Sequence, residues 1–453
     1  MEVERAQSRS NMVSQIVKPE RNYQVAFQSL RVTDPAAAWV QLVRDTAMDR
    51  FELLGFPSIA IEDWKYTNLA SWAKTYFRPA IKQSSLAATV VNTPSFAETT
   101  QSQLVVVNGF LREDLSSKEA LEQIVAVDLF NAIGDARYSK IVREYIARNA
   151  NYHDSGMVAL NTAFLSSGVF ILLPRNVELA QPIHVLYVAD GVRDNEVSFP
   201  RLLVVAEENS SATLIETFIS TGDAPYFTDA VAEIVINEGA RLEHYRVQRE
   251  SSNSLHIGKT AAELGRGSSY DSTAINLGAR LSRHDISVVM DHEGAECRVD
   301  GLYVTSSEQH ADTHSVIDHK QPHCNSHQLY KGILDGNGRA VFNGIIFVRE
   351  GAQKTDAMQT NKNLLLSDRA RVDTKPQLEI YADDVKCAHG AAVGQISEDE
   401  LFYLATRGIE PAVGRNLLTY GFAEEVIGKI KVDSIRAAVD EAVLKQLKTV
   451  LVS

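Results

Sequence analysis

Turn-like segments recur at a nearly constant spacing in the middle of this chain. In each segment a small residue follows the anchor position, and a larger side chain stands three positions beyond it. The anchors are Ser211, Gly239, Gly267 and Gly294, at intervals of 28, 28 and 27 residues. A fixed period of this size is typical of a solenoid, in which each coil buries its face only against the next coil. Every coil must turn at the same place, which explains why small residues recur there.

The period breaks after Gly294. Gly338 follows 44 residues later and Gly351 only 13 residues after that, which we interpret as insertions or a change in coil length. A β-sandwich with coincidental spacing is the alternative, but the repeated interval favours a solenoid of parallel strands.

Strand-like runs fill the region from about residue 158 to residue 395. Five of them are RLLVVAE, AEIVINE, DISVVMD, AVFNGIIFV and QLEIYAD, each bounded by residues that favour turns. No amphipathic segment of helical length separates them, which argues against alternating strand–helix units. We therefore predict a mainly β fold with a parallel β-solenoid core over residues 156–396. A helical N-terminal domain with its lead-in would occupy residues 1–155, and a helical C-terminal domain residues 397–453.

Three further segments support this division. Apolar residues between Trp39 and Leu54 recur at helical spacing, and Ser397 with Glu400 forms a capping box that predicts a helix start. Between the predicted N-terminal helix and the solenoid stands EDWKYTNL, residues 62–69, which we interpret as a packed loop.

Composition excludes several functional classes. The net charge of −13 argues against nucleic-acid binding, because neutralising phosphates requires a basic face. Three cysteines provide no disulfide framework and indicate a reducing compartment, so we expect a cytoplasmic protein. No apolar run approaches the roughly 20 residues that span a bilayer, and the first residues do not have the pattern of a signal peptide.

Histidines gather between residues 310 and 327. The members are His310, His314, His319, His323 and His327, with Cys324 among them. Stacked polar ladders on successive coils are the simpler interpretation. A metal site is the alternative because imidazole binds several transition metals, although the spacing matches no zinc motif.

The pair Cys387–His389 is the compact sulfur-and-imidazole pair of the chain. Lys386 stands beside the thiol, and its charge would favour the thiolate that binds metals and sulfur. A small buried cysteine at a solenoid turn is the competing interpretation. Phosphate-binding loops, nucleophile elbows and paired catalytic carboxylates are absent, so the sequence predicts no enzyme.

One long stretch resembles a known family. The segments SHQLYKGIL, AQKTDAMQTNKNLLLSDRARVDTKPQLEIYADDVKCAHGAAVGQ and DELFYLATRGI are similar to the SufB/SufD family of iron–sulfur cluster assembly proteins. EDWKYTNL and KCAHGAAVGQ follow the form of the SufD branch. In KPQLEIY, Ile380 stands where the SufB branch carries its sulfur-accepting cysteine.

The resemblance implies a right-handed parallel β-helix in a cytosolic complex with SufB and the ATPase SufC. SufC would bind the C-terminal helices, and clusters would form at the interface with SufB, beside His389 and Cys387. These two residues are therefore the candidate metal and assembly-site residues. Iron–sulfur clusters would pass through the complex transiently, with no cofactor held stably by this chain alone, and reduced FAD is a possible cofactor of the complex. A homodimer and a purely structural subunit without cluster contact are the alternatives.

Overall fold

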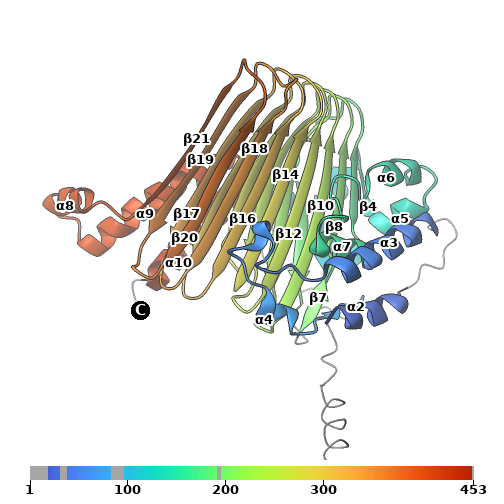
Figure 1. Cartoon of the computed structure of the whole chain (residues 1–453), viewed down its shortest axis with the longest axis horizontal. Coiled ribbons are helices and arrows are strands. Elements are labelled where there is room, and N and C mark those ends of the chain that lie inside the picture. The colour runs from blue at the N-terminus through green and yellow to red at the C-terminus, as the bar shows by residue number, and fades with distance from the viewer. Residues whose placement is uncertain (1–18, 31–37, 83–95, 191–194, 451–453) are drawn as a thin grey trace, which may run out of the picture.

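The computed structural model describes residues 19–30, 38–82, 96–190 and 195–450. Its centre is a parallel β-solenoid built from one 11-stranded sheet, here sheet A, and one 10-stranded sheet, here sheet B (Figure 1). From β8 onwards, consecutive strands alternate between the two sheets, so each coil contributes one strand to each. The predicted solenoid with helical regions at both ends is thereby confirmed.

Sheet A follows the order β20, β18, β16, β14, β12, β10, β8, β5, β4, with β1 and β7 at its margin. In chain order its strands are β1 (Arg78–Pro79), β4 (Val125–Asp128), β5 (Val169–Leu173), β7 (Glu196–Ser198), β8 (Arg201–Ala206), β10 (Tyr226–Ile236), β12 (Leu255–Leu264), β14 (Leu281–Met290), β16 (His310–His319), β18 (Arg339–Val348) and β20 (Arg371–Ile380).

Sheet B follows the order β21, β19, β17, β15, β13, β11, β9, β6, β2, β3. In chain order its strands are β2 (Gln103–Val107), β3 (Phe110–Leu111), β6 (Ile183–Ala189), β9 (Ser211–Ser220), β11 (Arg241–Arg249), β13 (Ser269–Asn276), β15 (Glu296–Thr305), β17 (Asn325–Leu334), β19 (Asp356–Leu365) and β21 (Lys386–Gly394). Because β2 and β4 already belong to these sheets, the region before residue 156 contributes strands as well as helices.

The length of each coil can be read from turns whose central residue has a left-handed backbone conformation. They fall at Asn209, Gly239, Gly267, Gly294, His323 and Lys354, spaced 30, 28, 27, 29 and 31 residues apart, with φ between 57° and 74°. The amide of each donates to a carbonyl of the next coil, as Gly239 does to Arg266. Left-handed backbone favours glycine because it has no Cβ, but His323 and Lys354 adopt it here.

This turn column corrects two details of the sequence analysis. Ser211 pairs with Arg241, so the first anchor stands two residues too late, and Asn209 is the equivalent of Gly239. The repeat also continues without a break after Gly294. A search for glycine alone misses this continuation, because His323 and Lys354 occupy the next two turns.

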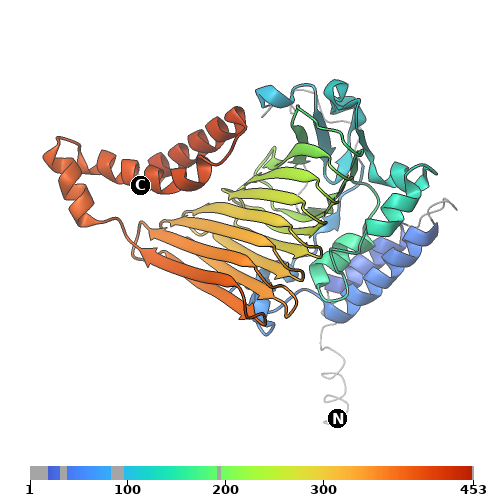
Figure 2. The same ribbon diagram turned by 90° about the horizontal axis from the view of Figure 1, so that it is seen from above.

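Helices flank the solenoid on two sides (Figures 1 and 2). The N-terminal group comprises α2 (Pro19–Gln28), α3 (Ala38–Leu54), α4 (Ala70–Ala73), α5 (Leu129–Gly134), α6 (Ser139–Tyr145) and α7 (Gly156–Ala163), and the C-terminal group α8 (Glu398–Thr406), α9 (Pro411–Ile427) and α10 (Asp433–Val450). Within the described ranges, no helix has the length and apolar character needed to cross a membrane.

The C-terminal helices differ in how they contact the solenoid. The end of α9 and the start of α10 pack on the outer face of sheet B, where Val426, Ile427 and Ile435 are buried. Lys429 adds an ion pair of 2.7 Å to the buried Asp300 of β15. By contrast, α8 projects beyond the last strands (Figure 2). It begins as predicted, because the Ser397 hydroxyl caps it by accepting from the Glu400 amide.

Alanine substitutions at two turn glycines separate backbone strain from crowding. Left-handed φ costs a non-glycine residue about 1–2 kcal/mol, and this cost applies to both Gly239→Ala and Gly267→Ala. At Gly239 a Cβ would also lie 2.4 Å from the Asn209 Oδ1 atom, whereas at Gly267 nothing lies within 4 Å. We expect G239A to lower the free energy of unfolding more than G267A does, measured by urea denaturation. Equal losses would mean that Asn209 moves aside without cost.

Candidate functional site

The solenoid ends in two edge strands. In the described part of the chain β20 pairs with β18 and β21 with β19, and neither has a partner on its other side. The Lys386 amide donates to the Thr355 carbonyl of the previous coil. Even-numbered residues of β21 therefore face β19, and odd-numbered residues turn their N–H and C=O groups to the open edge. Cys387 and His389 are odd-numbered, so their backbone groups are available to another strand.

The composition of both edge strands suits pairing with another chain. In β21, the run from Ala388 to Gly394 contains only alanine, glycine and valine besides His389, so no charge or bulk protects the edge. In β20, the amides of Arg371 and Tyr381 donate towards β18. Pro376 is even-numbered, so its missing N–H falls on the open side, where an edge strand tolerates proline.

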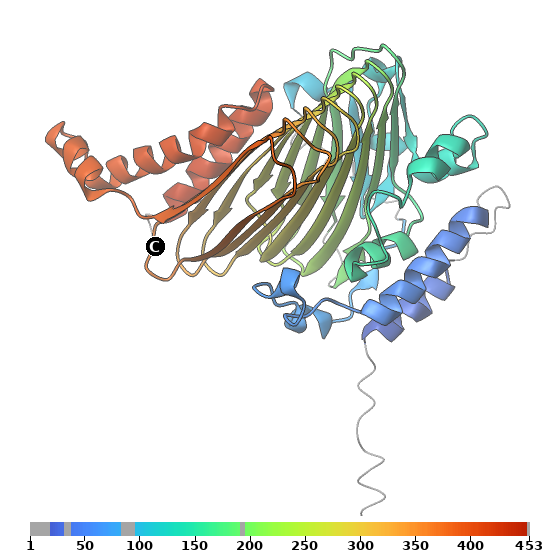
Figure 3. The same cartoon turned by 45° about the horizontal axis from the view of Figure 1, so that its top comes forward.

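The side chains of Cys387 and His389 lie on the inner face of the last coil. Cys387 is in register with Ala357 and packs against the solenoid core as a half-buried residue. His389 is in register with the buried Gln359 of β19, but no later coil covers it and it is exposed. The pair therefore lies at the open end of the solenoid, with Cys387 turned into the core and His389 at the surface. Figure 3 shows this end of the solenoid with the top of the molecule turned forward.

Ile380 occupies the column that faces Cys387 across the last coil. Two coils earlier, His319 and Ser326 stand in the same two columns, and His319 Nε2 lies 2.8 Å from Ser326 Oγ. The side chains of these two columns thus touch at His319 and Ser326, and both columns continue to the last coil, where they end at Ile380 and Cys387. Ile380 is 41% exposed, so this position also lies at the open end.

Burial raises the pKa of the Cys387 thiol above its ordinary value, and the nearby Asp356 carboxylate acts in the same direction. Lys386 does not reverse this, because adjacent residues of a strand point to opposite faces. The expectation that Lys386 favours a thiolate is therefore wrong for the isolated chain.

The five histidines between residues 310 and 327 do not converge. His310 and His314 lie on the outer face of β16, and His319 points inward. His323 forms a turn, and His327 is exposed on β17 in the other sheet. Among the described residues no group of three or more His, Cys, Asp or Glu side chains could hold a metal ion. The stretch has no common site because strand alternation and the turn direct its members to four different places.

The segment EDWKYTNL has a structural role that sequence analysis foresaw only as packing. It lies across the outer face of sheet A. The Thr67 hydroxyl donates to Asp312 at 2.5 Å, and the Arg283 guanidinium stacks over the Trp64 ring at 3.9 Å. At its near end Glu62 forms an ion pair of 2.8 Å with Lys375 of β20. We call residues 62–67 the strap, because they join the N-terminal region to the last coil of sheet A.

The interior of the solenoid contains a buried polar network that sequence analysis missed. Arg246 donates to His256, whose other ring nitrogen lies 2.5 Å from the Glu250 carboxylate. In the neighbouring column His244 Nε2 lies 3.0 Å from Glu216 Oε1. Buried charges persist only when they are paired and hydrogen-bonded, as these are. The signal in the sequence was the unusual content of charged residues in strands such as RLEHYRVQR.

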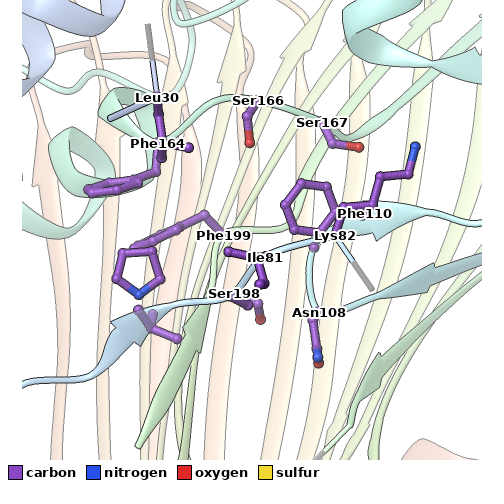
Figure 4. A pocket seen from close by; sticks show the side chains of 14 residues that line it. Leu30, Ile81, Lys82, Asn108, Phe110, Phe164, Ser166, Ser167, Ser198 and Phe199 are labelled. Carbon is purple, nitrogen blue, oxygen red and sulfur yellow. The ribbon is translucent and has the colours of Figure 1, made fainter. Parts of the chain in front are cut away.

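A cavity of about 250 Å³ lies on the N-terminal side of the solenoid (Figure 4). Its lining is mainly apolar, and two of its rings, Phe164 and Phe199, stack on each other at 4.7 Å. Small-molecule sites usually measure about 300–1,000 Å³. With Lys82 as the one cation among the lining residues, the cavity does not fit the isoalloxazine and pyrophosphate of a flavin dinucleotide. Its lining residues include Pro79 of β1, Phe110 of β3 and Ser198 of β7, and β3 stands at the end of sheet B opposite β21, so we assign the cavity no part in the site.

Comparison with known proteins identifies the family. Residues 187–422 match the SufBD core domain of SUF system FeS cluster assembly, and residues 18–185 match the SufBD N-terminal region. The chain therefore belongs to the SufBD family of iron–sulfur cluster assembly proteins.

Its relatives include proteins of the SufD branch. A SufBD family protein of Synechocystis sp. is 35% identical over 408 residues, which cover 88% of this chain and 89% of the relative. SufD of Escherichia coli is 36% identical over 282 residues, covering 62% and 67% of the two chains. SufD of Bacillus subtilis is 25% identical over 423 residues, covering 91% and 94%. The resemblance found in the sequence is confirmed.

Alkylation rates test the state of Cys387. Cys297 and Cys324 are buried and Cys387 is half-buried, so iodoacetamide should modify Cys387 first in the folded chain. Because its pKa is raised, the rate should be low near neutral pH and should still be rising above pH 9, the ordinary pKa of a thiol.

Lys386→Ala should leave this profile unchanged, and Cys387→Ser should remove the reaction. A fast reaction at pH 7 that K386A abolishes would show that the lysine does activate the thiol.

Proposed function

We propose that this chain is a SufD-type, non-catalytic subunit of a cytoplasmic SUF assembly complex. Its open end would pair with a SufB-type chain, and its C-terminal helices would bind the ATPase SufC. Nascent clusters would form where His389 and Cys387 meet the partner. The observation that carries the proposal is the position of this pair on the inner face of an unpaired edge strand, within a family whose members assemble iron–sulfur clusters.

The open end supports the pairing. Two unpaired strands of about ten residues each leave a row of backbone donors and acceptors that another chain satisfies well by adding strands. A second parallel solenoid with its own open end offers matching strands for both sheets at once. A SufB-type chain fits this description, and a second copy of the present chain is the competing partner.

The chemistry of the pair supports a shared site. Thiolate and imidazole are ligands that iron and iron–sulfur clusters accept. Two positions on one strand are about 7 Å apart, so Cys387 and His389 can direct their ends towards one ion or cluster but cannot complete its ligand set. Ile380, opposite Cys387, brings no thiol, so the missing sulfur ligands would come from the partner. The cluster is cargo of the complex in this proposal.

The surface of α8 and of the first turns of α9 supports SufC binding. Phe402 and Tyr403 are 71% and 58% exposed, and Val413 and Leu417 are about half exposed. Beside them a groove of about 490 Å³ separates α9 from the last coil. Large exposed apolar side chains on two neighbouring helices would suit a protein interaction site. Because the groove also borders β21, a protein bound there would lie next to the open end.

A second candidate function is a purely structural subunit. The raised pKa of Cys387 favours it, because a neutral thiol is a poor ligand. In this case the pair would serve only packing, and the chain would hold SufB and SufC together without contact to iron or cluster.

Replacement of His389 distinguishes the two functions. His389→Ala removes an exposed imidazole, so fold and complex should survive. We expect iron and sulfide per intact complex to fall at least several-fold, because alanine cannot bind iron. The measurement is metal and sulfide analysis of complexes with stoichiometry checked on the same sample. Equal cluster content would leave this chain as a structural subunit.

Proline substitutions in β21 test the pairing of edges. The Ala391 N–H faces the open edge, so Ala391→Pro removes a donor that no described residue of this chain uses. The Ala392 N–H faces β19, so Ala392→Pro breaks a bond within the solenoid. We expect A391P to fold, to retain SufC and to lose SufB in co-purification, whereas A392P should lower the melting temperature. Full SufB capture by A391P would place the interface elsewhere.

A further inference from the structure

A ladder of glutamine side chains leads through the interior to His389. Gln328 of β17, Gln359 of β19 and His389 of β21 stand in register on the inner face of sheet B. Gln359 Nε2 donates to Gln328 Oε1 at 2.7 Å, and Ser315 Oγ of the opposite sheet donates to the same oxygen at 3.2 Å. The ladder thus has a direction, because the Gln359 amide nitrogen points back towards the earlier coil.

The last amide of the ladder has an unused acceptor. Gln359 is 1% exposed, and its Oε1 atom has no hydrogen-bond partner among the described residues. An amide places its oxygen and nitrogen on opposite sides. Because Nε2 points to β17, Oε1 points towards β21, where His389 is the residue in register. The structure shows no hydrogen bond between this oxygen and His389. Neighbouring strands are about 4.8 Å apart, so rotation of the exposed His389 side chain can bring a ring nitrogen to the oxygen.

Packing fixes the position of this amide. Across the interior stands Gly344 of β18, where an added Cβ would lie 2.3 Å from Gln359 Nε2. The small residue leaves the space that the amide occupies. Gln359 is therefore held by Gln328 on one side and by Gly344 across the coil.

We propose that Gln359 is a positioning residue for His389. When the His389 ring turns towards the interior, Oε1 accepts a hydrogen bond from one imidazole N–H, which fixes the ring orientation and leaves the other nitrogen unprotonated at the open end. A ring nitrogen freed in this way is the form that binds a metal. The inference rests on the proposed function for its purpose, but the hydrogen bond can be measured on the isolated chain.

The test is the tautomer of His389 in the full-length chain, read from ¹⁵N chemical shifts of labelled histidine at a pH where the ring is neutral. The signal among the 12 histidines is assigned by its loss in His389→Gln. We expect one tautomer in the wild type. Gln359→Met, which preserves volume but has no acceptor, should give a mixture of two tautomers. Gly344→Ala, which displaces the amide, should do the same, and Gln359→Glu, which retains an acceptor oxygen, should restore a single tautomer.

Gln248→Met is the matched control. Gln248 is another fully buried glutamine of sheet B, with hydrogen bonds to Glu250 and Gly278. Its replacement should lower stability comparably and leave the His389 signal unchanged. An unchanged tautomer in folded Q359M would overturn the positioning role.

Cluster content separates this inference from the proposed function. In intact complexes we expect Q359M to lower iron and sulfide several-fold and Q248M to leave them unchanged. If H389A retains its clusters while Q359M still mixes the tautomers, the proposed function fails and the hydrogen bond stands. If H389A loses its clusters and Q359M changes neither readout, the positioning role fails alone.

Discussion

Every coil of this protein depends on the next one for its backbone hydrogen bonds. A parallel strand satisfies only half of its N–H and C=O groups on each side, and the other half must come from the following coil. Stacking therefore stabilises the interior coils and leaves the last coil incomplete. The N-terminal strands β2, β3 and β4 stand at the beginning of the stack, whereas β20 and β21 end it without a cover in the described part of the chain. The candidate site lies where this requirement is unmet.

The interior shows why the two sheets differ in sequence. All five aliphatic runs that predicted strands belong to sheet A. The strands of sheet B place Glu216, His244 and Arg246 in the interior, where they are paired with each other or with residues across the coil. A pattern search for apolar alternation finds the first sheet and overlooks the second. The polar interior costs desolvation but specifies the register of each coil, because a shift by one residue would bury unpaired charges.

The fold was largely predictable, and the site only in part. A recurring turn is a local property, so Gly239, Gly267 and Gly294 revealed the repeat, while His323 and Lys354 concealed its continuation because they adopt a glycine conformation. The adjacency of Cys387 and His389 was visible in the sequence. The position of this pair on an unpaired edge strand was not visible, because the sequence does not show at which coil the stacking of strands stops. Gln359, 30 residues from His389 in the chain, could be connected to it only through the pairing of β19 with β21.

The strap gives the solenoid a mechanical property that stacking alone does not provide. A stack of coils held only by its own ladders can be opened from its free end, one strand at a time. Here the ion pair of Glu62 with Lys375, the stacking of Trp64 on Arg283 and the bond from Thr67 to Asp312 connect β14, β16 and β20 from outside. A pulling force on β20 is therefore shared with coils deeper in the stack. If the open end pairs with another chain as proposed, the strap would help to keep β20 in its own stack when the two chains separate.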